Sequence, residues 1–289
     1  MNEALIKKAR SQYHRRLIES RVLTISSNGV ASNADADNAP SLAIAKSIAE
    51  KIGASVCGKV KGQTVGKLFE KITMEFVSDT FPKLQHIRPG LWTVLNLGNQ
   101  SAIKTWDFAQ YEHLAYLSRI VSENKKLSTT LGNDYMVAPD VVVYRELYDD
   151  EEINRESFIV TDDVCTMADL RKKNGGKPIL HASISAKWTM RSDRAQNSRT
   201  EALNLIRNRK GHLPHIVVVT GEPLPSRIAS LALGTGDLDC VYHFALYELM
   251  EAVNEYGQNG REDIVETLQN LVEGKRLKDI SDLPLDLSC

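Results

Sequence analysis

The first half of the chain repeats apolar residues at helical spacing. Residues three and four positions apart lie on one face of a helix, so such a run predicts an amphipathic helix. The clearest apolar face consists of Leu68, Phe69, Ile72, Phe76 and Val77. Helices are predicted over residues 3–19, 41–53, 64–79 and about 108–124, and a polar, turn-rich loop over residues 26–40.

The second half changes to short β-branched runs that alternate with helical segments. Strands are predicted over residues 140–144, 178–187, 215–220 and 239–242. Further helices are predicted over residues 194–209, 225–233, 243–254 and 263–272. Residues 146–163 carry eight acidic side chains and one basic side chain, so we expect a solvated, partly irregular face there. This order of elements predicts an α/β core with helices on both faces of the sheet.

No linker rich in Gly or Ser and no internal repeat divides the 289 residues. We therefore expect one domain over residues 1–289, with an α-rich part over about 1–130 and a strand-containing core over about 131–289. The longest apolar runs fall far short of the roughly 20 residues that a membrane span needs. Charges also interrupt the N-terminal segment, which predicts a cytoplasmic protein without a membrane partner. The four cysteines lie far apart, which favours free thiols over a zinc site or disulfides.

The charge balance points to one region of the chain. The 36 basic and 37 acidic residues give a net charge of −1, which argues against a uniformly basic nucleic-acid coat. Residues 187–210 nevertheless carry seven Lys or Arg against two acids, which fits a phosphate-binding footprint. Within it, Arg191 and Arg194 can each pair with guanine, and Asp193 can accept from cytosine. The alternative is an ordinary capped helix start with solvated arginines.

Three polar residues are expected to meet at one end of the predicted sheet. Asp140 opens one strand, Lys187 closes the next, and Glu201 lies on the following helix. Ser185 faces the same side as Lys187, because residues two apart in a strand point together. Carboxylates that hold Mg²⁺ or Mn²⁺ beside a lysine that positions water suit phosphodiester hydrolysis. Ser185 stands where an acid is usual, so an ordinary strand end with a solvated lysine remains an alternative.

Longer motifs give these positions a family context. They cover residues 134–140, 181–189, 191–197, 201–205, 208–220 and 274–287, with 32–35, 62–64 and 83–90 in the first half. These segments resemble the type II (type IIF) restriction endonucleases of the CCGG-cutting PD-(D/E)XK family. The resemblance extends over nearly the whole chain. It implies a restriction-endonuclease-like α/β core, in which a mixed central sheet is flanked by helices and residues 131–289 carry catalysis and recognition.

The resemblance also implies roles for individual residues of the active site. The second acid of the family has moved from the strand to the next helix, so Glu201 supplies the carboxylate that Ser185 lacks. Glu70, on an N-terminal helix, is implied as a further active-site acid. Asp140, Glu201 and Ala186 are implied as metal ligands. Ala186 replaces a cysteine of the family, which is harmless because its main-chain carbonyl faces the metal.

The implied partner is double-stranded DNA. The residues implied to contact DNA are Asp35, Gln63, Arg191, Asp193, Arg194 and Arg227. Among them, Asp35 reads the outer base pair, and Gln63 and Arg227 contact the minor groove. A twofold arrangement of subunits reads a palindrome, and the resemblance implies GCCGGC cut after the first G to leave 5′ overhangs.

The resemblance further implies a homotetramer that holds two DNA sites, with a simple dimer as the alternative. A cognate DNA methyltransferase is expected in the host, without a stable complex. Two other functions fit the same residues: a repair or junction-resolving nuclease, and a non-catalytic protein whose helix 194–210 binds G·C-rich DNA. The set of Asp140, Lys187 and Glu201 disfavours the second, because a pure binder has no use for carboxylates beside phosphates.

Overall fold

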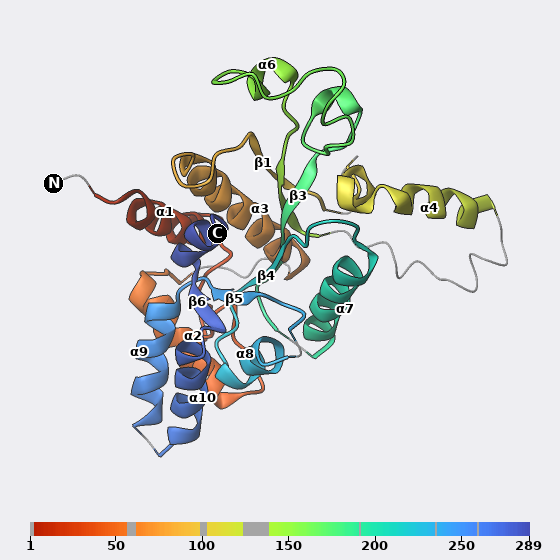
Figure 1. Ribbon diagram of the computed structural model, residues 1–289. Coiled ribbons are helices and arrows are strands. Elements are labelled where there is room, and N and C mark those ends of the chain that lie inside the picture. Colours follow the sequence, from red (N-terminus) through yellow and green to blue (C-terminus); the bar gives the residue numbers. More distant parts are fainter. Residues whose placement is uncertain are drawn as a thin grey trace.

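A six-stranded mixed sheet, flanked by helices, forms the centre of the molecule (Figure 1). The computed structural model describes residues 3–56, 62–98, 103–123, 139–190, 192–234, 236–258 and 260–289. The strands are β1 (Trp92–Asn96), β2 (Val141–Arg145), β3 (Ile179–Lys187), β4 (His215–Thr220), β5 (Cys240–His243) and β6 (Leu277–Asp279). They pair in numerical order, β1 to β3 antiparallel and β3 to β6 parallel. The predicted α/β fold class is confirmed.

Helices occupy both ends of the chain and most connections between strands. The α-helices are α1 (Leu5–Glu19), α2 (Ala39–Ile52), α3 (Gly62–Thr80), α4 (His113–Glu123), α6 (Asp150–Ile153), α7 (Ser192–Asn208), α8 (Pro225–Ala232), α9 (Leu246–Gly257), α10 (Glu262–Glu273) and α11 (Leu283–Asp286). The 3₁₀ helices are η1 (Phe81–Lys83), η2 (Thr105–Asp107), η3 (Ala109–Tyr111), η4 (Lys172–Asn174) and η5 (Ile280–Asp282). None of the described helices has the length and apolar character needed to cross a membrane.

Most predicted elements are present, with ends displaced by a few residues. The helix predicted from residue 108 begins at His113, because the 3₁₀ helix η3 precedes it. The helix predicted from His243 begins at Leu246, because β5 continues through His243. The sequence pattern missed β1 and β6. Each is short, and β6 has only three residues, too few to show an alternation of its own.

The apolar face predicted on α3 packs against β1, β2 and β3. Phe69, Ile72, Phe76 and Val77 are buried there, whereas Leu68 is only partly buried. The packing fixes α3 along the sheet, so a polar residue next to this face lies close to the strand ends. Glu70 is such a residue.

The antiparallel and parallel pairs of the sheet bring three chain segments to one edge. Val141 pairs with Ile184, so the start of β2 lies beside the end of β3. Lys187 pairs with Thr220, so the end of β3 also lies beside the end of β4. The predicted meeting of strand ends is therefore present.

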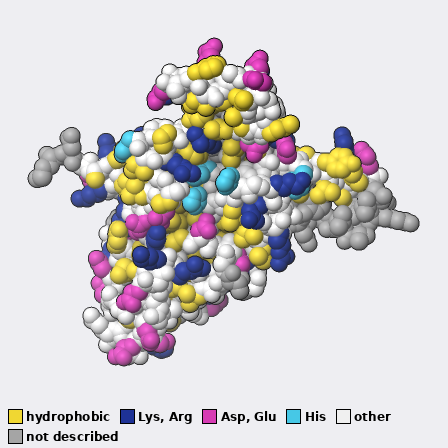
Figure 2. All heavy atoms as spheres, in the orientation of Figure 1, with side chains coloured by type: hydrophobic (Ala, Val, Ile, Leu, Met, Phe, Trp, Pro, Cys, Tyr) yellow, Lys and Arg dark blue, Asp and Glu magenta, His cyan; other side chains and the backbone are white. Residues whose placement is uncertain are grey.

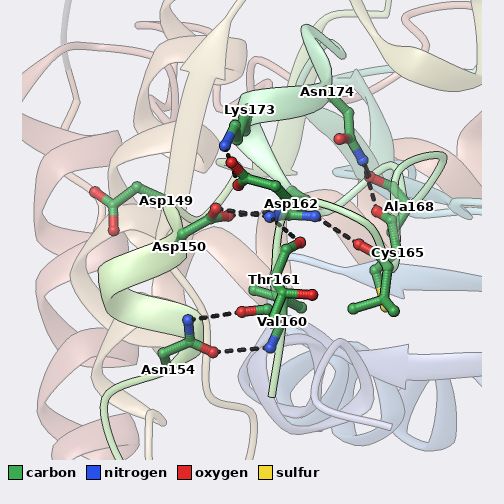
Figure 3. Close-up of polar contacts among 12 residues, drawn as sticks. Asp149, Asp150, Asn154, Val160, Thr161, Asp162, Cys165, Ala168, Lys173 and Asn174 are labelled. Carbon is green, nitrogen blue, oxygen red and sulfur yellow. Dashed lines mark hydrogen bonds and ion pairs between the residues drawn. The ribbon is translucent and has the colours of Figure 1, made fainter. Parts of the chain in front are cut away.

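The segment between β2 and β3, residues 146–177, projects from the body at the top of Figure 1, and we call it the lobe. The solvated, partly irregular face predicted for residues 146–163 is more ordered than expected, because its residues Asp150 and Thr161 bind Arg171, which is buried and lies later in the lobe. Its guanidinium donates two hydrogen bonds to Asp150, at 2.6 and 2.7 Å, and others to the carbonyls of Thr161 and Val164. Figure 3 shows further contacts of the lobe, among them those of Asn154 with Val160 and of Lys173 with Asp162.

Candidate active site and nucleic-acid interface

The predicted Asp140 and Lys187 are in direct contact. Lys187 Nζ donates to Asp140 Oδ2 at 2.8 Å, and the main-chain N–H of Ala186 donates to the same oxygen at 2.9 Å. The two side chains are only 17% and 18% exposed. In the partly buried setting this charge-assisted pair fixes the orientation of both groups.

Glu201 joins this pair through a hydroxyl group. Ser185 Oγ lies 3.4 Å from Asp140 Oδ2 and 3.4 Å from Glu201 Oε2, with the buried Ser198 Oγ at the same distance. Glu201 and Ser198 project from consecutive turns of α7. The small residue at position 185 therefore leaves room for a carboxylate that comes from the helix.

Glu70 reaches the same centre from α3. Burial raises the pKa of Glu70 to about 7, and the negative charges of Asp140 and Glu201 act in the same direction. Lys187 and Lys67 oppose this shift. The structure therefore brings all five predicted catalytic residues together, although they come from three separate stretches of the chain.

The charges of the cluster set the protonation of its other members. Burial alone would lower the pKa of Lys187, but the carboxylates of Asp140, Glu201 and Glu70 outweigh it, so the pKa is raised and the ammonium stays charged. Burial raises the pKa of Glu201, and Lys187 offsets part of that rise. Three carboxylates thus surround the ammonium group of Lys187, and Lys67 adds a second positive charge that acts on Glu70.

The donor set of this cluster suits a divalent metal ion with a preference for oxygen. Among the described residues, no three His, Cys, Asp or Glu side chains form a ready-made metal cage. Mg²⁺ does not need one, since it is commonly bound by one or two carboxylates, with waters and substrate phosphates completing its shell. Asp140 and Glu201 converge on Ser185, and the main chain of Ala186 adjoins Asp140. The oxygen atoms of these residues therefore suit a Mg²⁺ ion.

A second polar centre lies at the end of β4 and the start of α8. Arg227 donates to Asp35 Oδ2, and its guanidinium Nη1 lies 3.8 Å from Glu222 Oε1. The structure therefore brings together two of the predicted DNA-contacting residues, Asp35 and Arg227. Glu222 was not among the predicted site residues. The signal that would have found it is an acid two residues after a buried strand, at the edge of the sheet where Lys187 also lies.

The other predicted DNA contacts fall outside what the structure describes. Arg191 is outside the described residues, and so are the side chains of Gln63, Asp193 and Arg194. The backbones of the last three lie in α3 and α7. Because α7 also carries Glu201, the predicted base-reading positions and an active-site acid belong to one helix.

Comparisons with known proteins agree over nearly the full length. The family model described as NgoMIV restriction enzyme matches residues 13–289. The type II restriction enzyme NgoMIV of Neisseria gonorrhoeae is 51% identical over 285 residues, which are 98% of this chain and 99% of the relative. A solved complex of the restriction endonuclease PspGI with substrate DNA covers 98% of this chain and 92% of its own, at 12% identity and a TM-score of 0.24.

Proposed function

We propose a reaction, a DNA site and residue roles for this chain on the premise that it belongs to the NgoMIV restriction enzyme family and is a type II site-specific endonuclease. The family membership confirms the resemblance found in the sequence and sets aside the junction-nuclease and pure-binder alternatives. The proposed reaction is Mg²⁺-dependent cleavage of both DNA strands at a CCGG-containing palindrome. The observation that carries it is the contact of Lys187 with Asp140, backed by Glu201 through Ser185.

In the proposed reaction a water molecule attacks the phosphorus atom and one phosphodiester P–O bond breaks. The charged Lys187, held by Asp140, orients this water and faces the phosphate. Asp140, Glu201 and the carbonyl of Ala186 would hold Mg²⁺, and Mn²⁺ suits the same oxygen donors. The bound ion supplies stabilisation of the negative charge that develops on the phosphate.

Glu70 and Ser185 support this centre without a covalent role. With a pKa near 7, Glu70 can carry either a proton or a charge at neutral pH, and so tunes the negative charge of the site. The hydroxyl of Ser185 keeps the carboxylates of Asp140 and Glu201 in register. We propose both as members of the catalytic set.

The proposed DNA site is GCCGGC, cut after the first G of each strand to leave 5′ overhangs. Arg191 and Arg194 pair with the two guanines of a half-site, and Asp193 accepts from the cytosine amino groups. Asp35 reads the outer base pair, while Gln63 and Arg227 contact the minor groove. The position of residues 193 and 194 on α7, the helix of Glu201, supports this arrangement.

We further propose a homotetramer that binds two DNA sites. A palindrome cut on both strands needs at least two active sites. The lobe offers apolar surface for additional contacts between copies of this chain, since Phe158 is 81% and Met167 90% exposed. Figure 2 shows apolar and acidic side chains side by side on it. A host DNA methyltransferase is expected to protect the same sites without a stable complex.

The test is cleavage of plasmid DNA with and without Mg²⁺, followed by sequencing of the ends. We expect discrete fragments that end in the proposed overhang, and none without a divalent ion. Asp140→Ala should retain DNA in a gel-shift assay without cutting it. Ends that lack CCGG would remove the proposed recognition core, and full activity of Asp140→Ala would remove the proposed catalytic set.

A further inference from the structure

The turn at the end of β4, residues 220–222, contacts three segments that the proposed function uses. The hydroxyl of Thr220 donates to the carbonyl of Lys187 at 2.8 Å. The main-chain N–H of Gly221 donates to the same carbonyl at 3.3 Å. Gly221 also packs so closely on the Trp188 ring that a Cβ built there would lie 2.5 Å from Cε3. The turn is therefore fixed against the segment that leads from the active site toward residue 191.

The same turn is attached to the loop that carries Asp35. The side-chain amide of Asn33 is buried and donates to the carbonyl of Gly221 at 2.8 Å. Asn33 stands two residues before Asp35, so the position of this loop depends on the turn. In the chain the two parts are 188 residues apart.

Glu222 completes the junction from a fully buried position. Its Oε2 accepts from the main-chain N–H of Met190 at 2.8 Å, and Oε1 accepts from the N–H of Leu224 at 3.2 Å. Oε1 also lies 3.8 Å from the guanidinium of Arg227. One carboxylate thus holds the residue directly before Arg191 and the arginine that is paired with Asp35.

We propose that Glu222 is a positioning residue that couples two parts of DNA recognition: the outer base pair, read by Asp35 beside the minor-groove contact of Arg227, and the CCGG core, read from residue 191 onward. The inference rests on the proposed function. When Asp35 turns from Arg227 to a base, Glu222 remains as a carboxylate partner that keeps the guanidinium in place. Its bond to Met190 ties that place to the start of the core-reading segment.

The coupling distinguishes Glu222 from a buried carboxylate that only stabilises the fold. A residue with a purely structural role would change the cleavage of all DNA sites by the same factor. A positioning residue of this kind changes the ratio between sites that differ at the outer base pair. The ratio is therefore the quantity to measure.

The experiment compares kcat/KM on short duplexes that contain GCCGGC with duplexes that contain ACCGGT. Glu222→Gln keeps the shape of the side chain but replaces one of its two accepting oxygens by a donor. We expect the ratio to fall at least tenfold in this variant, while duplexes with an altered CCGG core remain uncut. Glu248→Gln is the matched control, since Glu248 pairs with Arg10 on another part of the molecule. Its ratio should equal that of the wild type.

Glu222→Asp keeps the test valid if the glutamine variant does not fold. The shorter aspartate retains the charge but cannot reach both Met190 and Arg227, so the ratio should fall here also. If the wild type cuts GCCGGC but the variants show an unchanged ratio, or an equal loss on both duplexes, the inference is wrong and the proposed DNA site stands. A wild type that cuts neither duplex overturns the proposed DNA site as well. A wild type that cuts both equally overturns the inference together with the role of Asp35.

Discussion

The active site and the junction at Glu222 each contain a glutamate whose pKa is raised to about 7 by burial. Glu70 faces further carboxylates, and Asp140 and Glu201 add to the rise in its pKa. Glu222 faces partners of the opposite kind, because the N–H of Met190 and the guanidinium of Arg227 lower its pKa against the effect of burial. The same residue type therefore serves two different electrostatic designs.

The difference lies in what each centre still requires. In the active site the carboxylates of Asp140, Glu201 and Glu70 lie close together around Lys187, and such a cluster favours the binding of a metal cation. The carboxylate of Glu222 already has its donors within the protein, so it calls for no external ion. We infer that the active site catalyses the reaction, whereas the junction at Glu222 keeps the DNA-contacting residues in position. The following predictions separate the two, in order of decreasing effect.

Lys187→Ala should abolish catalysis at the active site and leave the junction at Glu222 intact. Removal of one preorganised group of this kind costs about 100-fold to 1000-fold in rate. We expect cleavage to fall by at least that factor, while a gel shift still shows preference for the proposed site. Lys173→Ala, in the lobe, is the control and should cut normally. Loss of site preference in Lys187→Ala would show that the two centres are not separable.

Asp35→Asn should weaken site preference and leave cleavage largely intact. The amide can no longer accept with both oxygens and loses its charge toward Arg227, so the outer base pair is read less well. One base contact is worth about 1–3 kcal/mol of discrimination. We expect competition between duplexes that differ at that pair to show a loss of this size, with cleavage of the preferred duplex largely retained. Asp37→Asn, in the same loop, provides the matched control.

The pH dependence of stability should reveal the burial of Glu222. Its pKa is about 7 in the folded protein against 4.5 ordinarily, so the folded state binds this proton more tightly than the unfolded chain. The resulting stability is fully present below pH 4.5 and is lost as the pH rises through 7. Glu222→Gln does not titrate, so relative to the wild type it should gain about 1–3 kcal/mol between pH 5 and 8.

Urea unfolding at four pH values measures this difference. Glu248→Gln serves as the reference, because burial of Glu248 is outweighed by Arg10 and its pKa is lowered. It is ionised in both states above pH 5, so its stability relative to the wild type should stay constant there. A constant difference for Glu222→Gln would mean that Glu222 is ionised throughout this pH range.

Substitutions in the lobe should change the assembly of subunits and should affect neither the active site nor the junction at Glu222. Replacing Phe158 and Met167 by serine removes exposed apolar surface but leaves the contacts of Arg171 with Asp150 in place. We expect light scattering to show a particle of about half the wild-type mass, and the rate advantage of a two-site plasmid to disappear. A wild type near twice the 32.2 kDa chain mass would instead support the simple dimer.

Several features followed from the sequence because they depend on neighbours in the chain. Helical spacing on residues 64–79 located α3, and short apolar runs, the clearest of them β-branched, located β2 to β5. Because strand ends and side-chain alternation are local properties, the convergence of Asp140, Ser185 and Lys187 could be predicted as well. Glu70 and Asp35 were reached only through the family resemblance, since nothing in their local pattern separates them from ordinary surface acids.

Other features were decided by the tertiary structure alone. Arg227 meets Asp35 across 192 positions of sequence, and Glu222 meets Met190 across 32. The buried Arg171 binds Asp150 and Thr161, two residues of the segment 146–163 whose composition predicted a solvated, partly irregular face. Local periodicity reports which face of an element is buried, but it carries no record of which distant element will cover that face. Hydrogen bonds and ion pairs between such elements exist only after the sheet has brought the ends of β3 and β4 together.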